Sequence, residues 1–276
     1  MPQNLHSIKN IHKYFGTTGS KPVAVLCDNS NIYVCKYDRR RGDDPRLNEY
    51  LGACLLRCCG IPTPDIAWVR IDTAHNPNKN AVEDFFLSDI CFGSLYLPNT
   101  SDFHEIIEDR SITDLKNINR IDLLQISLFD LWVSHQDRTQ ENCNLLVGAY
   151  ENEAKERIIA IDNASIFNFE FGEHQSLQPL RYEQSMLSST QLKILYREDK
   201  VVFSDAKIAI EIWQNGIHNC IKTVDNILKQ IEVVLDTDVI HLKNWVLDEL
   251  CAQSHLERVE KLFYNYLSQT FPNQIL

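Results

Sequence analysis

The sequence has no hydrophobic run long enough to cross a membrane and no excess of basic residues. No stretch approaches about 18 apolar residues, and the N-terminal segment lacks the apolar core of a signal peptide. With 27 basic and 38 acidic residues, the formal net charge is −11, which disfavours general binding to nucleic acid or to anionic membranes. We therefore expect a soluble protein whose partners include neither a membrane nor nucleic acid.

Cysteine is too sparse for a disulfide-stabilised protein. The nine cysteines are spread over 276 residues, most of them lie in apolar runs, and no C-x-x-C pair is present. A zinc site built from paired cysteines is therefore not expected. Reduced thiols in apolar segments behave as small hydrophobic side chains. This pattern predicts a reducing, cytoplasmic location.

The length and composition are those of a globular protein with two lobes. Hydrophobic residues make up 44% of the chain and charged residues 24%, which are ordinary values. About five strands and one helix are expected in residues 1–100, whereas residues 101–276 read as mostly helical. We therefore predict an α+β fold with a strand-rich N-terminal lobe and a helical C-terminal lobe.

The predicted N-terminal lobe begins with a β-hairpin. Two runs rich in β-branched and aromatic residues, Pro22–Asp28 and Ile32–Tyr37, flank an Asn-Ser-Asn turn. An amphipathic helix is expected over Leu47–Cys59, because its apolar residues recur at helical spacing and Gly60 follows it. Ile66–Ile71 and Phe85–Cys91 are predicted to form two further strands.

Two charged residues of this lobe lie in otherwise apolar surroundings. Lys36 ends the second strand of the hairpin, where a cation is either exposed at the sheet edge or directed into a nucleotide cleft. Glu49 lies on a helix that is apolar on two faces, so we expect it to be partly buried, with Lys36 as an available partner. Alternatively, Glu49 is a first-turn acid favoured by the helix dipole.

The C-terminal part is predicted to pack around a buried helix over residues 119–134. Ser204 is expected to cap a long helix that ends near Leu235, and Asp238 precedes another. Ser254-His-Leu-Glu257 has the pattern of a capping box that opens a last helix, ending near Thr270. Core positions on the long helix follow a helical spacing: Trp213, Ile217, Ile221, Val224 and Leu228. The polar stretch 168–190 is either a substrate-gating segment or an ordinary connection.

Residues 135–147 concentrate the polar groups that phosphoryl transfer requires. Transfer from a nucleotide needs a carboxylate near the attacking hydroxyl, a carboxylate and an amide oxygen for Mg²⁺, and a cation for the phosphates. Asp137, Asn142 and Asp162 supply the first three groups, and Lys36 supplies the cation. Each residue alone has an ordinary structural explanation, but their order along the chain favours a kinase-type site.

The same residues resemble a known family. The motif H-x-D-R-x-x-x-N-x-N-L-L-V from His135, followed by I-D-N-x-x-x-F from Ile161, is similar to the HipA-like kinases. Their fold is of the protein-kinase-like and phosphatidylinositol-kinase-like type. The resemblance, which covers about residues 16–168, implies a bilobal protein-kinase-like fold with its N-lobe in 1–100 and its C-lobe in 101–276. The catalytic loop would be 135–147 and the metal-binding segment 162–167.

The resemblance also implies an activity and roles for residues. The activity is ATP- and Mg²⁺-dependent phosphorylation, often of Ser or Thr on a protein. Asp137 would be the catalytic carboxylate, Asn142 and Asp162 the Mg²⁺ ligands, Lys36 the phosphate-binding lysine and Glu49 its ion-pair partner. The loop over the phosphates would comprise Gly16, Thr17, Thr18, Gly19 and Ser20.

The sequence departs from related kinases at two places. Asn163-Ala164 replaces the glycine-containing turn that commonly follows the metal-binding aspartate, and Thr139 stands where lipid-type kinases often carry histidine. Two alternatives therefore stay open. One is a catalytically weak nucleotide-binding protein that acts through a regulatory protein partner. The other is a kinase-fold enzyme that phosphorylates a small molecule or transfers a nucleotidyl group.

Overall fold

The N-terminal part of the chain forms a six-stranded sheet in the order β1-β5-β6-β4-β3-β2. The structure, a computed structural model, describes residues 2–16, 21–38, 44–151, 153–167, 177–197, 201–235 and 237–274. Neighbouring strands of the sheet are antiparallel except for β1 and β5, which are parallel. The strands are Gln3–His6 (β1), Lys13–Tyr14 (β2), Val23–Leu26 (β3), Ile32–Lys36 (β4), Ile66–Arg70 (β5) and Cys91–Leu95 (β6).

Strands β3 and β4 form the predicted hairpin. Val23 pairs with Cys35 and Leu26 with Ile32, so the register brings Lys36 to the far end of β4. The turn is built from the polar residues between the strands. Asn29 accepts a hydrogen bond from the Asn31 N–H at 3.1 Å, and Ser30 has a positive φ of 66°.

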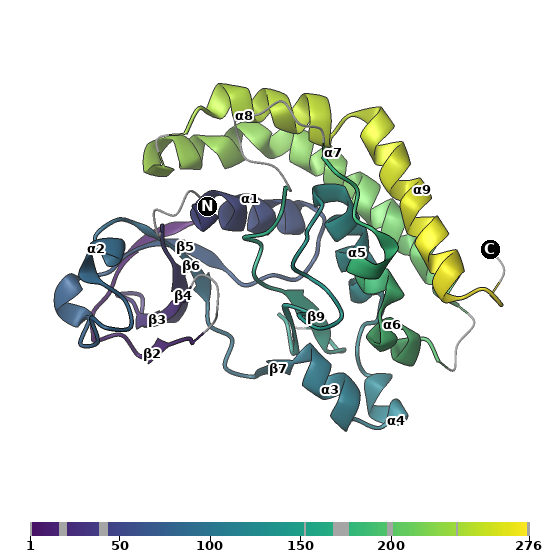
Figure 1. Cartoon of the computed structure of the whole chain (residues 1–276), viewed down its shortest axis with the longest axis horizontal. Coiled ribbons are helices and arrows are strands. Elements are labelled where there is room, and N and C mark those ends of the chain that lie inside the picture. Colours follow the sequence, from purple (N-terminus) through teal and green to yellow (C-terminus); the bar gives the residue numbers. More distant parts are fainter. Residues whose placement is uncertain are drawn as a thin grey trace.

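Helix α1, Pro45–Cys58, packs on the six-stranded sheet and also reaches the helical part (Figure 1). Asp44 caps its N-terminus, and Gly60 follows it with a φ of 66°, as expected of a helix-ending glycine. Tyr50 stacks on Trp68 of β5, and its hydroxyl donates to the Ile227 carbonyl at 2.9 Å. The helix therefore connects the two parts of the molecule.

The prediction of a strand over Phe85–Cys91 was wrong. Residues Asp84–Leu87 form a short helix, α2, and the strand begins only at Cys91. A run of three apolar residues does not distinguish a buried strand from one helical turn. Here Glu83 and Asp84 place negative charge at the start of the turn, which favours the helix.

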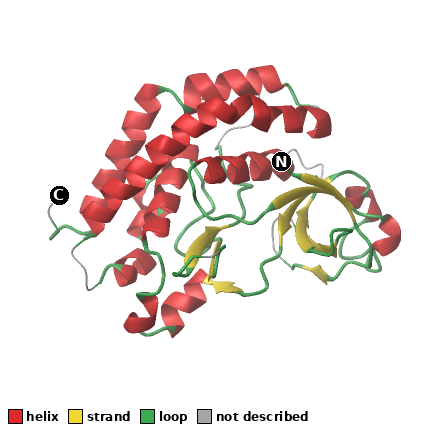
Figure 2. Cartoon of the chain, turned by 180° about the vertical axis from the view of Figure 1, so that it is seen from behind, coloured by secondary structure: helices red, strands yellow, loops and turns green. Residues whose placement is uncertain are grey.

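The second part of the chain is mostly helical and carries a small three-stranded sheet (Figure 2). Its strands are Thr100–Asp102 (β7), Leu145–Gly148 (β8) and Arg157–Ala160 (β9). The helices are Phe103–Asp109 (α3), Ile112–Leu115 (α4), Ile121–Val133 (α5), Thr190–Leu195 (α6), Val202–Leu235 (α7), Val239–Trp245 (α8) and Gln253–Thr270 (α9). Short turns of helix occur at Thr73–His75, Tyr182–Gln184, Met186–Ser188 and Val246–Leu250. The α+β division therefore agrees with the prediction.

Helix α5 is the buried centre of this part, and every residue from Asp122 to Val133 is buried. Helices α7 and α9 cover it (Figure 1). Trp132 packs edge-to-face on Trp213 of α7, and its indole N–H donates to the Leu250 carbonyl at 2.8 Å. This packing fixes the end of α5 from which the chain enters residues 135–147.

Two predicted helix starts in this part were wrong. Helix α7 begins at Val202, so Ser204 lies inside it and its hydroxyl donates to the Val201 carbonyl. Helix α9 begins at Gln253 after Ala252, so Ser254 is not its cap. A serine fits the first turn as well as the cap position, which makes such patterns ambiguous by one or two residues.

Other expectations for the helical part were met, with one exception. Asp238 caps α8 as predicted, since its carboxylate accepts hydrogen bonds from two N–H groups of the first turn. Four of the five predicted core positions on α7 are buried, but Ile221 is 43% exposed and therefore faces outward.

None of the described helices combines the length and the apolar content that a membrane span requires. All nine cysteines are free.

Candidate active site

A largely apolar cavity of about 320 Å³ lies between the six-stranded sheet, α1 and the small sheet. Its walls include Val34 and Phe92 from the large sheet and Leu146 from the small one. The chain passes between the two sheets through Tyr96 and Leu97, which also line the cavity. The charged side chains of its lining are gathered in one group: Lys36, Glu49 and Asp162.

Lys36 is one of the charged residues that line the cavity. It is the last residue of β4, and its neighbour in β6 is the buried Phe92. Its Nζ forms ion pairs with Glu49 and with Asp162, the latter at 2.6 Å. Burial would lower the pKa of Lys36, but the two carboxylates outweigh burial and raise it. Lys36 is therefore a buried cation and not a residue at an exposed sheet edge.

Glu49 reaches Lys36 from helix α1, so the ion pair predicted from the sequence is present. The residue is 2% exposed. One carboxylate oxygen contacts Lys36, and the other accepts from the Asn163 N–H at 3.0 Å. Burial raises the pKa of Glu49, an effect that Lys36 opposes. Glu49 thus joins β4 to the segment after β9, and it is more than a first-turn acid.

Asp162 comes two residues after β9 and contacts Lys36 from this second segment of the chain. Its backbone is left-handed, with a φ of 57°. Burial opposes ionisation, yet Lys36 lowers the pKa of Asp162 below its ordinary value. The side chain keeps 34% of its surface exposed, so the carboxylate is charged and accessible from the cavity.

The predicted catalytic loop begins where α5 ends in a left-handed residue, Ser134. Next to it, His135 is fully buried and organises the loop. Its Nδ1 accepts from the N–H groups of Asp137 and Arg138 at 3.3 and 3.2 Å, so Nε2 carries the proton and donates to the Asp162 carbonyl at 2.9 Å. Burial, and then the Arg138 cation, hold the pKa of His135 well below its usual value. The ring is therefore a neutral structural link, the role favoured from sequence.

Arg138 points into the core and away from the cavity. Its guanidinium pairs with Asp130 of α5 and donates to the Ile161 carbonyl at 2.9 Å. It also donates to Asn163 Oδ1 at 3.2 Å. Of the two roles considered from sequence, the structure supports the positioning of the loop through a carboxylate.

Asp137 and Asn142 lie exposed on the surface of the same loop. The Asn142 amide nitrogen donates to the Asp137 carbonyl at 3.2 Å, so its Oδ1 is left to accept a ligand. Asn144 was not predicted as a site residue, although its Nδ2 donates to Asp137 Oδ2 at 3.3 Å. Its left-handed backbone, with φ 48°, turns it toward the loop. A polar residue two positions after Asn142 was the available sequence signal.

The oxygen atoms of Asn142 and Asp162 are ligands that suit a magnesium ion, whereas a metal site made entirely of protein side chains is not expected. In the part of the chain that the structure describes, no cluster of three or more His, Cys, Asp or Glu side chains could hold a metal. Mg²⁺ is commonly bound by one or two protein carboxylates together with phosphate oxygens and water. The Asp162 carboxylate lines the cavity, whereas Asn142 lies on the exposed loop and is not part of the cavity lining. One carboxylate and one amide oxygen are ligand types that suit that pattern.

The predicted phosphate loop is only partly described. Gly16 has open space around it, and Phe15 and Pro22 on either side of the loop line the cavity. Thr17, Thr18, Gly19 and Ser20 lie outside the described residues. The roles of all these residues remain predictions.

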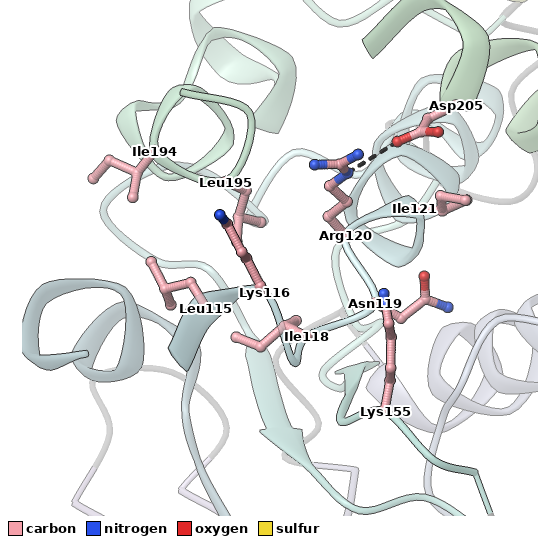
Figure 3. Close-up of a pocket in the computed structure, with 10 residues that line it drawn as sticks. All are labelled: Leu115, Lys116, Ile118, Asn119, Arg120, Ile121, Lys155, Ile194, Leu195 and Asp205. Carbon is pink, nitrogen blue, oxygen red and sulfur yellow. Dashed lines mark hydrogen bonds and ion pairs between the residues drawn. The ribbon is translucent and has the colours of Figure 1, made fainter. Parts of the chain in front are cut away.

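A second pocket, of about 340 Å³, lies at the other end of α5 (Figure 3). It is lined by aliphatic residues such as Leu115 and Ile194 and by the cations Lys116, Arg120 and Lys155. Arg120 is paired with Asp205 at 3.0 Å, as the dashed line in Figure 3 marks. Its described lining contains none of the predicted site residues, so we assign it no catalytic role.

Comparisons with known proteins agree with this geometry. A family model described as HipA-like kinase matches residues 8–233. Among solved structures, the Helicobacter pylori proinflammatory kinase CtkA is similar over 100% of both chains, with 12% identity and a TM-score of 0.53. The Golgi casein kinase is similar over 97% of this chain and 74% of its own, with 10% identity and a TM-score of 0.47. No match was found among curated proteins.

These findings support the predicted α+β, protein-kinase-like fold. The likeness to CtkA, at 12% identity, shows the fold alone. The family match begins between β1 and β2 and ends within α7. It therefore includes the five predicted site residues of the cavity and of the loop after α5, which are Lys36, Glu49, Asp137, Asn142 and Asp162. The chain therefore belongs to the HipA-like kinases and is a kinase-type phosphotransferase.

Proposed function

We propose that this protein is an ATP- and Mg²⁺-dependent kinase that phosphorylates Ser or Thr on a protein. The observation that carries the proposal is the position of Lys36. It is a buried cation at the charged end of an apolar cavity, and it contacts carboxylates from two elements far apart in the sequence. A nucleotide has the matching character, since its base is flat and largely apolar and its phosphates are anionic.

The cavity walls and Lys36 would divide the binding of ATP between them. Val34, Phe92 and Leu146 offer apolar surface to the base. Lys36, held in place by Glu49, would contact the phosphates. In the structure Asp162 forms an ion pair with Lys36. When the nucleotide binds, we expect the Asp162 carboxylate to give up part of this contact and to bind the metal.

Asp162 and Asn142 would hold the magnesium ion through a carboxylate and an amide oxygen. Bound there, Mg²⁺ neutralises negative charge on the phosphate oxygens. Asn142 is aligned for this role because its amide nitrogen is already bonded to the Asp137 carbonyl. The neutral His135 fixes the Asp162 backbone and thereby the direction of the carboxylate.

Asp137 would accept the proton of the attacking hydroxyl group. The hydroxyl oxygen forms a bond to the γ-phosphorus, the bond from that phosphorus to the β–γ bridging oxygen breaks, and ADP leaves. Asn144 donates to one Asp137 oxygen, which leaves the other for the substrate. Because Asp137 is exposed on the loop, an acceptor carried on a large protein can reach it.

The test compares two forms of labelled ATP. The purified chain is incubated with Mg²⁺ and extract of its own cells, with the label on the γ-phosphate or on the α-phosphate. We expect only the γ-label to reach protein, on Ser or Thr. Asp137→Ala should reduce labelling by about 100-fold or more, and the exposed Asp225→Asn on α7 should not change it.

Each other outcome assigns a different function. Equal labelling by wild type and Asp137→Ala would overturn the assignment of this site. Transfer of the α-label would indicate nucleotidyl transfer, and γ-label in a small-molecule fraction a small-molecule kinase. ATP with Mg²⁺ that raises the melting temperature without any transfer would indicate a nucleotide-binding protein that acts through a partner.

We expect this activity in the cytoplasm, because most of the nine cysteines lie in apolar runs and no C-x-x-C pair is present. Unpaired cysteines of this kind are typical of proteins in a reducing compartment. The acidic net charge of −11 argues against nucleic acid as a partner. We therefore expect ATP and a protein substrate as the main partners, and a regulatory protein partner remains compatible with the site.

A further inference from the structure

Asn163, the residue after Asp162, is held more tightly than a flexible turn would require. Its N–H donates to Glu49 Oε2 at 3.0 Å, and its Oδ1 accepts from Arg138 Nη2 at 3.2 Å. The residue is almost fully buried. It therefore connects α1 to the catalytic loop at a position where related kinases led us to expect a glycine-containing turn.

Gly52 of α1 provides the space that Asn163 occupies. A Cβ atom at residue 52 would lie 2.4 Å from Asn163 Cβ and 2.8 Å from Asn163 Cγ, closer than real carbon atoms approach. Glycine inside a helix is destabilising relative to alanine. The close approach of Asn163 gives a physical reason for a glycine at this position of α1.

A second residue of α1 holds the same segment. Asn48 lies one helical turn before Gly52, so the two residues share a face of the helix. Its Nδ2 donates to the carbonyls of Ala164 and Ile166 at 2.9 and 3.2 Å. Helix α1 thus holds the segment after Asp162 through hydrogen bonds of Asn48 and Glu49, in the turn before Gly52, in addition to the Gly52–Asn163 contact.

The segment needs this support because Asp162 has an unfavourable backbone conformation. A residue other than glycine adopts a φ near 57° only at a cost in free energy. His135 fixes the Asp162 carbonyl, and Glu49 fixes the N–H that follows it. A freely rotating residue at position 163 would loosen the second of these anchors.

We infer that Asn163 is a positioning residue that locks the metal-binding segment onto α1, with Gly52 as the matching surface of the helix. The inference rests on the proposed function, in which Asp162 binds the metal. Because Asn163 bonds to Glu49 and to Arg138, docking of α1 and orientation of Asp162 are a single event. The absence of a glycine after Asp162 strengthens the site and does not impair it.

Size-swap variants test the lock, because the clash at Gly52 depends on the side chain at Asn163. Asn163→Gly should raise the Mg²⁺ concentration for half-maximal activity by about 10-fold, as the loss of an outer support to a metal ligand does. Gly52→Ala should lower kcat by about 10- to 100-fold through overpacking. In the double variant the clash disappears, so kcat should return to within about threefold of Asn163→Gly alone.

Gly216→Ala on α7 is the matched control. A Cβ at residue 216 would lie 2.6 Å from Cys59 Cα, an equally severe clash that does not involve the candidate site. Asn163→Gly should not rescue it. The lock is overturned if the effects of Gly52→Ala and Asn163→Gly simply multiply, or if Asn163→Gly leaves the Mg²⁺ dependence unchanged.

Two further measurements do not depend on catalysis. The melting temperatures of the two single variants and the double variant, without nucleotide or metal, should show the same rescue. Binding of Mn²⁺, measured by electron paramagnetic resonance in the presence of ADP, should weaken about 10-fold in Asn163→Gly. If the wild type binds Mn²⁺ and transfers no phosphate, the proposed function fails, and these two measurements on the variants still decide on the lock. If the double variant shows no rescue of the melting temperature and Asn163→Gly binds Mn²⁺ as tightly as the wild type, the lock alone is overturned.

Discussion

The buried charges of the cleft and those of the helical core have similar geometry but differ in their access to solvent. In the cleft, Lys36 contacts Asp162 at 2.6 Å, and the Asp162 side chain is 34% exposed. In the core, Arg157 contacts Asp122 at 2.8 Å, and the Asp122 side chain is 0% exposed. Distance alone therefore does not separate a structural ion pair from one that can take part in binding.

The use of each carboxylate explains the difference. Asp122 accepts from Arg157 Nε and Nη2, both at 2.8 Å, and from the Ile158 N–H at 2.9 Å. Both of its oxygens are thus engaged within the protein. Asp162 faces a cavity on one side, so its carboxylate can exchange a protein partner for a ligand. Substitutions should therefore affect stability in the core and activity in the cleft.

The largest expected effect is that of Asp122→Asn on stability. The substitution leaves Arg157 buried without its main counter-charge, which costs about 3–5 kcal/mol of the free energy of unfolding. Denaturant unfolding measures the loss. The control is Asp225→Asn, which removes a pair with Lys243 of 2.6 Å, but on a side chain that is 73% exposed. For Asp225→Asn we expect the free energy of unfolding to fall by about 0–1 kcal/mol. Equal losses in the two variants would show that burial does not distinguish the two ion pairs.

Asp162→Asn should have the opposite signature in the cleft. Removal of the proposed metal ligand should lower kcat by at least about 100-fold, which corresponds to about 2.7 kcal/mol in the activation barrier. The free energy of unfolding should change by about 1 kcal/mol or less, because the carboxylate is partly solvated and Lys36 keeps Glu49. Kinetics at varied Mg²⁺ and denaturant unfolding measure the two effects. A large loss of stability with normal kcat would place Asp162 among the structural pairs.

Features set by local sequence were predictable. The hairpin of β3 and β4, helix α1 and the buried helix α5 follow from side-chain periodicity and turn residues within short windows. The pairing of Lys36 with Glu49 was also inferred from local sequence, because a charged residue among apolar neighbours needs a counter-charge. Asp137 and Asn142 could be proposed from the sequence because both lie within one short loop.

Features set by tertiary contacts were not predictable. Nothing in the sequence indicated the role of Gly52, because a glycine is needed there by the side chain of Asn163, which is far away along the sequence. The replacement of a glycine-containing turn by Asn163-Ala164 led us to doubt the flexibility of the segment, whereas the hydrogen bonds of Asn163 to Glu49 and Arg138 hold it in place. The exposed Ile221 follows the same rule, because helical spacing alone does not show which positions a neighbouring helix covers.

The smallest expected effect concerns His255, a titratable group of the closed core. Burial, with Arg258 acting in the same direction, lowers the pKa of this histidine. Its Nε2 donates to the Trp132 carbonyl at 2.9 Å, and its Nδ1 accepts from Arg258 at 2.8 Å. Protonation would therefore break the second bond and place a charge beside a guanidinium. The folded protein consequently holds the neutral ring.

The sign of the pH effect follows from this lowered pKa. Histidine in the unfolded chain has a pKa of about 6.5. Below that pH the unfolded chain binds a proton at His255 that the folded chain does not bind, so stability falls as the pH falls. At pH 5.5 this histidine should lower the free energy of unfolding by up to about 1.4 kcal/mol relative to its value at pH 7.5 or above. His255→Gln should flatten the pH dependence of the unfolding free energy by that amount. His218→Gln should keep the wild-type slope, because its ring is exposed to water in both states. A slope that His255→Gln leaves unchanged would show that this part of the core admits the charge, and that the contrast between closed core and open cleft does not extend to His255.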